Sequence, residues 1–186
     1  MFDYTRTTRT CSVSQLHPSL AQAIRDYFQT KQVGDPDKDT VLCCETISTR
    51  EKPTKLFGWL DGNPDTNIHL ATLLTSEWLI WARTGDQTGT VVTGAKLQVI
   101  KVKAFVTKHA KNMELEITGF LSDSKEYVRG NLEMGPDIAA QKFCDTVGLA
   151  VQEVKPPVKH KFPRWMGGLI SSIPIIYTNG TNRQIT

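Results

Sequence analysis

In the stretch "LATLLTSEWLIWAR", residues 70–83, apolar side chains run almost without a break from Leu70 to Trp81, and the polar triplet Thr75-Ser76-Glu77 interrupts them. The runs on either side of this triplet are rich in side chains that favour β-strands. A polar triplet between two such runs predicts a hairpin turn. The alternation of strand side chains places apolar residues on both faces of the second strand: Trp78, Ile80 and Ala82 on one, Leu79 and Trp81 on the other. We therefore expect a sheet that is covered on both faces, at least in part.

A period of two extends from this hairpin over most of residues 40–132. Further strands are predicted at residues 40–49, 55–60, 90–97, 99–106, 113–121 and 126–134. The strand at 99–106 alternates Ile100, Val102 and Ala104 with lysines, which predicts a half-exposed strand with these three side chains inward. About seven or eight short antiparallel strands at this spacing are typical of a barrel or a sandwich.

Two amphipathic helices are predicted to flank the β region. Residues 17–32 start with Pro18 and carry apolar residues at helical spacing. Residues 135–154 follow the last strand, with Gly135 as the expected cap and Pro136 in the first turn. The second helix has an apolar stripe made of Ala139, Phe143, Val147, Ala150 and Val151. Residues 1–12 are polar, and we expect them to be irregular.

The length of 186 residues and the 39% hydrophobic content favour one domain with appendages. We divide the chain into an N-terminal segment with a helix (1–37), a β domain with its closing helix (38–154) and a C-terminal arm (155–186). No apolar run reaches about 18 residues, and "MFDYTRTTRT" lacks the apolar centre of a signal peptide. We therefore expect a cytoplasmic protein.

The cysteine pattern predicts structural thiols. Cys43 and Cys44 are neighbours in a predicted strand, so their side chains point to opposite faces. That arrangement suits neither a mutual disulfide nor a shared metal site, and no C-x-x-C motif occurs. Free cysteine is commonly buried, so we expect at least one of the pair in the core.

The hairpin "HLATLLTSEWLIWAR", the strand "MELEITGF" and the helix after Pro136 resemble bacterial pleckstrin-homology-like (PH-like) domains of unassigned function. The resemblance covers about residues 38–154. It implies an α+β fold, mostly antiparallel β: a PH-like barrel of about seven strands capped by a C-terminal helix, with an extra N-terminal helix and a C-terminal arm. The two tryptophans of the hairpin would then belong to the barrel wall and core.

The resemblance also indicates a loop to inspect for ligand binding. Family members that bind phosphoinositides do so through a basic loop between their first two strands. The corresponding loop here, "STREKPTK", contains Arg50, Lys52 and Lys55 together with Glu51. The apolar "LFGWL" follows in place of further basic residues. This composition favours a solvated turn over an inositol-phosphate site.

No catalytic, cofactor or metal motif stands out in the chain. "GTVVTGAK", residues 89–96, differs from a phosphate loop because Ala95 separates Gly94 from the lysine, and Leu97 replaces the magnesium-binding hydroxyl. The four histidines are far apart in the sequence, and none belongs to H-E-x-x-H. We expect no enzyme activity, cofactor, metal or small-molecule substrate. A barrel of this size is filled by its own side chains.

The C-terminal arm carries the clearest charge asymmetry. Residues 155–186 hold five basic residues and no acid, so they contribute +5 to a total of +3 and leave −2 for the rest. Lys159, Lys161, Arg164 and Trp165 suit an anionic membrane surface, or less well a nucleic-acid backbone. The apolar part, residues 169–177, suits packing on this or a neighbouring barrel. We expect a binding or scaffolding module that binds a protein partner or itself, with a peripheral membrane adaptor as the alternative.

Overall fold

The structure, a computed structural model, describes residues 4–50, 65–107, 111–120 and 127–154. The five-stranded sheet has the order β1 (Tyr4–Thr10), β2 (Thr40–Arg50), β3 (Asn67–Thr75), β4 (Trp78–Gly85) and β5 (Val91–Lys96). The three-stranded sheet has the order β6 (Ile100–Val106), β7 (Met113–Phe120) and β8 (Tyr127–Glu133). Every pair of neighbouring strands is antiparallel. The α-helices in the described residues are α1 (Pro18–Lys31), the single turn α2 (Pro36–Asp39) and α3 (Ile138–Glu153).

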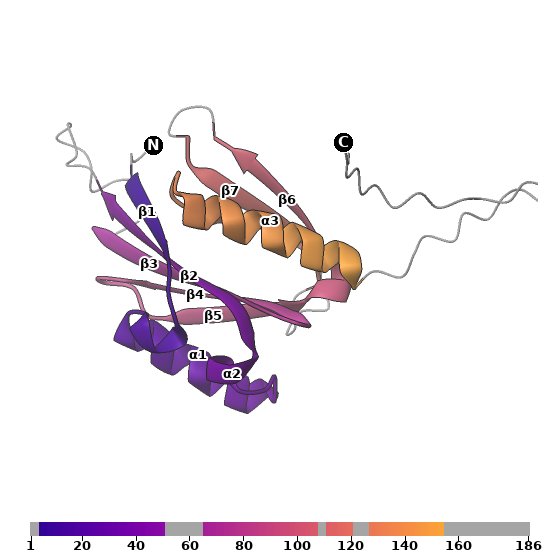
Figure 1. Cartoon of the computed structure of the whole chain (residues 1–186). Helices are drawn as coiled ribbons and strands as arrows, with labels where there is room; N and C mark the ends of the chain where they lie inside the picture. The colour runs from indigo at the N-terminus through magenta and orange to yellow at the C-terminus, as the bar shows by residue number, and fades with distance from the viewer. Residues whose placement is uncertain (1–3, 51–64, 108–110, 121–126, 155–186) are drawn as a thin grey trace, which may run out of the picture. The chain divides into compact units, whose positions relative to one another are not determined.

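The fold is therefore α+β and mostly antiparallel, with a C-terminal helix, as the sequence predicts (Figure 1). Two 3-10 turns complete the described elements, η1 (Val13–Gln15) and η3 (Leu97–Val99). The short turn η3 leads directly from the five-stranded sheet into the three-stranded one. Among the described residues, the strand pairing forms two separate sheets and does not close into one barrel.

The hairpin predicted at residues 70–83 is confirmed. Strands β3 and β4 pair in register from Leu74 opposite Leu79 outward, and Ser76 and Glu77 form the turn between them. The Thr75 hydroxyl accepts a hydrogen bond from the Trp78 backbone N–H at 2.9 Å. The polar triplet thus satisfies backbone groups that the end of the ladder leaves unpaired.

Both faces of the five-stranded sheet are covered, as the two-sided apolar pattern predicts. One face packs against α1 and η1 in what we call the α1 cluster, which includes Leu20, Ile24, Phe28, Cys43, Leu73, Ile80 and Ala82. The other face packs against α3 and the three-stranded sheet in the α3 cluster, which includes Cys44, Leu79, Ile100, Leu115, Phe143 and Val147. Trp78 and Trp81 are half-buried and pack against the α1 and the α3 cluster, respectively.

Both predicted helices are confirmed, with small changes at their ends. Gln32 ends α1 in the left-handed conformation, with φ of 53°. The cap of α3 is Asp137 and not Gly135, because the chain is still extended at Asp137 and turns helical only at Ile138. The Asp137 carboxylate accepts the backbone N–H of Thr8 at 2.6 Å, so this cap binds β1.

The prediction that residues 1–12 are irregular is wrong for residues 4–10, which form β1. The strand pairs with β2 from Tyr4 opposite Arg50 to Thr10 opposite Cys44. After Tyr4 the strand contains threonine and arginine alone, so it lacks the alternating apolar side chains from which the other strands were predicted. Burial instead comes from Thr8, whose hydroxyl lies 2.8 Å from that of Thr46 and accepts the Gly135 N–H at 2.7 Å.

The strand predicted at residues 55–60 and the arm at residues 155–186 lie outside the described residues. Within the described part of the chain, no helix combines the length and the apolar character needed to cross a bilayer.

Candidate functional site

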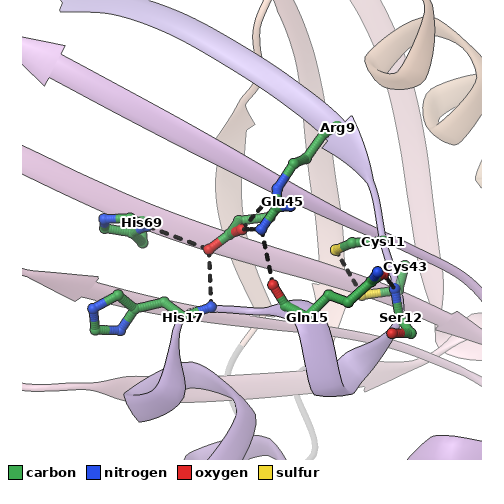
Figure 2. A network of polar contacts seen from close by, with 8 residues as sticks. All are labelled: Arg9, Cys11, Ser12, Gln15, His17, Cys43, Glu45 and His69. Carbon is green, nitrogen blue, oxygen red and sulfur yellow. Dashed lines mark hydrogen bonds and ion pairs between the residues drawn. The ribbon is translucent and has the colours of Figure 1, made fainter.

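A buried carboxylate, Glu45, lies at the centre of a polar network beneath the start of α1 (Figure 2). Its side chain is only 2% exposed. One carboxylate oxygen accepts Arg9 Nη2 at 2.6 Å and Arg9 Nε at 3.1 Å. The other oxygen accepts the backbone N–H of His17 at 3.0 Å and lies 3.3 Å from His69 Nδ1. The network therefore joins β1, β2, β3 and α1 at one point.

The strand register explains why these groups meet. Arg9 and Glu45 are directly opposite each other on β1 and β2, and cross-strand neighbours of opposite charge attract. His17 is the cap residue of α1, so Glu45 lies at the positive end of that helix. The side chain of Glu45 points to the same face of β2 as Cys43, two residues earlier, which is the face that α1 covers.

Hydrogen bonding keeps this carboxylate charged. Burial alone would raise the pKa of Glu45, but the hydrogen bonds from Arg9, His17 and His69 outweigh burial and hold the pKa below its usual range. The same contact with Glu45 raises the pKa of the Arg9 guanidinium. Both side chains are therefore ionised at neutral pH, and each neutralises the charge of the other.

The two histidines lie against each other beside Glu45. Their ring centroids are 4.6 Å apart, and the rings are tilted by 41°. His17 Nδ1 is buried without a hydrogen-bond partner among the described residues. In that same part of the chain, no group of three or more His, Cys, Asp or Glu side chains is placed to hold a metal ion. The network is thus a junction between elements, and its acceptor atoms on Glu45 are already used.

A pair of thiols lies next to this network. Cys11 Sγ and Cys43 Sγ are 3.9 Å apart, and both cysteines are free thiols (Figure 2). The backbone N–H of Cys11 donates to the Cys43 carbonyl at 3.1 Å, so the two residues extend the β1–β2 ladder by one position. A shallow pocket of about 190 Å³ opens beside them; its lining includes both cysteines, Ser12, Val13, Pro36 and Val41.

The two thiols differ in acidity, and so do the other cysteines. The hydrogen bond with Cys43 lowers the pKa of Cys11, which is half-buried. The same bond, together with burial, raises the pKa of Cys43 well above its usual value. Burial raises the pKa of Cys44 and of Cys144 to about 11. Since the thiolate is the nucleophile, Cys11, with its lowered pKa and partial exposure, is the better placed of the two thiols to act as one.

A second feature is the edge of the three-stranded sheet, where apolar side chains are exposed. The inward positions of β6 are Ile100, Val102, Ala104 and Val106, and only Ile100 is fully buried. Ala104 is exposed although it alternates with the lysines, and Val106 is 55% exposed. Their cross-strand partners, Leu115 and Met113, are buried in the α3 cluster. We call Val102, Ala104 and Val106 with the outer backbone of β6 the β6 edge.

Of the ligand-binding residues predicted from the sequence, Arg50 is the one that lies in the described part of the chain. Arg50 ends β2, where its guanidinium donates to the Tyr4 hydroxyl at 3.0 Å and lies over the Tyr4 ring at 5.6 Å. This arginine therefore fastens the start of β1. Six further candidates lie outside the described residues: Lys52, Lys55, Lys159, Lys161, Arg164 and Trp165.

Sequence analysis missed Arg9, Glu45 and Cys11 as a group. A usable signal was the acidic residue inside the strand "TVLCCETIST", because a lone carboxylate amid strand-forming side chains needs a cationic partner. Comparison with known protein families, curated proteins and solved structures finds no significant match to this chain.

Proposed function

We propose that this protein is a non-catalytic binding module that self-associates, with the β6 edge of one copy binding an apolar segment of the C-terminal arm of another. The observation that carries the proposal is the exposure of Ala104 and Val106 opposite the buried Leu115 and Met113. An edge strand has unpaired backbone groups that can accept a further strand. Here the edge also has apolar side chains at the positions that such a strand would cover.

The chain itself contains a segment that suits this edge. Residues 169–173, "LISSI", carry three apolar side chains, two serines and no charge, and Pro174 after them would end strand pairing because it lacks an N–H. An extended run of five residues reaches about 16 Å, within the length of seven-residue β6. Exchange of the same segment between two copies would bury two edges at once, in a closed symmetric dimer.

We also propose that the two sheets and α3 represent the PH-like arrangement implied by the sequence resemblance. The order of the elements supports it: antiparallel strands in two sheets, followed by one amphipathic helix. In such a fold the core is filled by the chain's own side chains, so partners bind at the surface. The filled α1 and α3 clusters agree with a surface-binding function.

Light scattering of the full chain at micromolar concentration tests the proposal. We expect a dimer for the wild type and a monomer for Val106→Lys, because a lysine on an edge strand opposes further strand pairing. The matched control is Val91→Lys, at a 65% exposed valine on the edge strand β5 of the other sheet; it should stay dimeric. Truncation after Val154 should also give a folded monomer. A monomeric wild type, or a dimer that survives Val106→Lys, contradicts the proposal.

The second candidate function is a peripheral adaptor on an anionic membrane. The charge of +5 in residues 155–186 favours it, as do four residues that are near one another in the sequence: Lys159, Lys161, Arg164 and Trp165. Sedimentation with vesicles that contain phosphatidylserine separates the two candidates. A monomer that pellets with these vesicles at low salt, and is released at high salt, supports the adaptor and contradicts self-association.

A further inference from the structure

Cys11 and Cys43 satisfy the backbone requirement for a disulfide. They stand directly opposite each other at the end of the β1–β2 ladder, with a backbone hydrogen bond between them. Opposite residues in an antiparallel pair have Cα atoms about 4.5–5.5 Å apart. That spacing lies within the range of about 4.4–6.8 Å that disulfides span. The sulfurs, at 3.9 Å, need to close to about 2 Å, which a side-chain rotation achieves without separating the strands.

The two thiols differ in their exposure and in the groups around them. Cys11 is half-buried and lines the pocket, so a small oxidant reaches it from solvent. Cys43 lies behind it in the α1 cluster, 3% exposed, with its sulfur 3.9 Å from the Cys11 sulfur. The hydrogen bond with Cys43 lowers the pKa of Cys11 and outweighs burial and the negative charge of Glu45, which raise it; the positive charge of Arg9 adds a smaller lowering effect. An accessible thiolate beside a second thiol is the usual arrangement of a peroxide-sensitive cysteine.

We propose that Cys11 and Cys43 form a reversible oxidation site for hydrogen peroxide, with Cys11 as the attacking thiolate and Cys43 as the resolving thiol. The Cys11 sulfur attacks one peroxide oxygen; an S–O bond forms, the O–O bond breaks, and hydroxide leaves and takes up a proton. The Cys43 sulfur then attacks the Cys11 sulfenic acid: an S–S bond forms, the S–O bond breaks, and the hydroxyl leaves as water with the proton of the Cys43 thiol. Two thiols lose two electrons in total, and one peroxide becomes two waters.

The disulfide would constrain a defined part of the fold. It closes a loop from Cys11 to Cys43 that contains η1, α1 and α2, and so fastens the elements that cover one face of the five-stranded sheet. Cross-linking such a loop restricts the unfolded chain, so the oxidised protein should unfold at higher urea concentration. A dithiol reductant should restore the original midpoint.

The test treats the full chain with hydrogen peroxide, blocks the remaining thiols by alkylation after unfolding, and maps the peptides by mass spectrometry. We expect a Cys11–Cys43 disulfide that dithiothreitol reverses, with Cys44 and Cys144 recovered as alkylated thiols. The Cys11→Ser variant should react with peroxide at about one tenth of the wild-type rate or at a lower rate, because the thiolate of low pKa is gone. The Cys43→Ala variant should instead accumulate sulfenic acid at Cys11, which dimedone traps.

Cys144→Ser is the matched control, since Cys144 is a buried thiol of raised pKa in α3, and it should leave both the rate and the disulfide unchanged. The wild-type peptide map decides the question even where a Cys43 variant fails to fold. A disulfide between any other pair, or a wild-type protein in which Cys11 reacts no faster than free cysteine at pH 7, overturns the proposal.

Discussion

Replacing Phe143 with alanine should destabilise the fold by about 4 kcal/mol. Phe143 lies on α3 and is fully buried in the α3 cluster, which also contains residues of both sheets. Removing a buried aromatic ring forfeits about 2 kcal/mol of transfer free energy. A residual cavity of about 70 Å³, at about 24 cal/mol per Å³, adds about 1.7 kcal/mol because the surrounding strands relax only in part.

Urea unfolding followed by tryptophan fluorescence and by far-ultraviolet circular dichroism measures this loss. Leu149→Ala is the matched control on the same helix; Leu149 is 61% exposed, so its loss should change the free energy of unfolding by less than about 0.5 kcal/mol. A loss below about 1 kcal/mol for Phe143→Ala would show that α3 does not pack between the sheets. Equal losses for the two variants would contradict the helix orientation.

Three further predictions concern stability and use the same assay. Trp81→Ala should cost about 3 kcal/mol because Trp81 packs against the α3 cluster, whereas Ser76→Ala in the exposed turn should cost less than about 0.5 kcal/mol; equal values would contradict the hairpin's orientation. Glu45→Gln should cost about 1–3 kcal/mol at pH 7. Since the pKa of Glu45 is lower in the folded than in the unfolded protein, its contribution to stability is present above the unfolded pKa of about 4.3 and is lost as the pH falls through the folded pKa. The free energies of unfolding of wild type and variant should therefore converge in acid. A constant difference between them at all pH values would refute this. Gly119→Ala should cost more than about 1 kcal/mol, because Gly119 has φ of 150° and a Cβ would lie 2.4 Å from the Val99 carbonyl oxygen. Gly130→Ala should be tolerated, because a Cβ there would meet open space. A larger loss for Gly130→Ala than for Gly119→Ala would contradict the path of β7.

The part of the fold that depends on local patterns was predictable from the sequence. The hairpin around Ser76 and the strands of the three-stranded sheet follow from alternation and turn residues that lie within a few positions of each other. The two helices follow from apolar spacing. Two-sided coverage of the sheet also followed, because β4 is apolar on both faces.

Features that depend on distant residues were not predictable. Strand β1 is recognisable only through partners such as Thr46 and Gly135, which lie far along the chain from Thr8. The exposure of Ala104 depends on what covers its face, and the alternation along β6 predicts its direction but not its burial.

The candidate site is non-local in the same way. Glu45 receives hydrogen bonds from positions 36, 28 and 24 residues away. Its partner Arg9 lies in a segment with no apolar pattern, and Cys11 meets Cys43 only because β1 pairs with β2. Single-residue chemistry identified the cysteines as thiols, while the difference in their acidity comes from the tertiary contact.

Site-specific photocross-linking from position 106 tests the central claim most directly. A benzophenone amino acid replaces Val106, which is 55% exposed at the β6 edge, and isotopically heavy and light chains are mixed before illumination. The account predicts cross-links between heavy and light chains that map to residues 165–177. Cross-links confined within one chain, or cross-links that never reach this segment, would contradict self-association through the β6 edge.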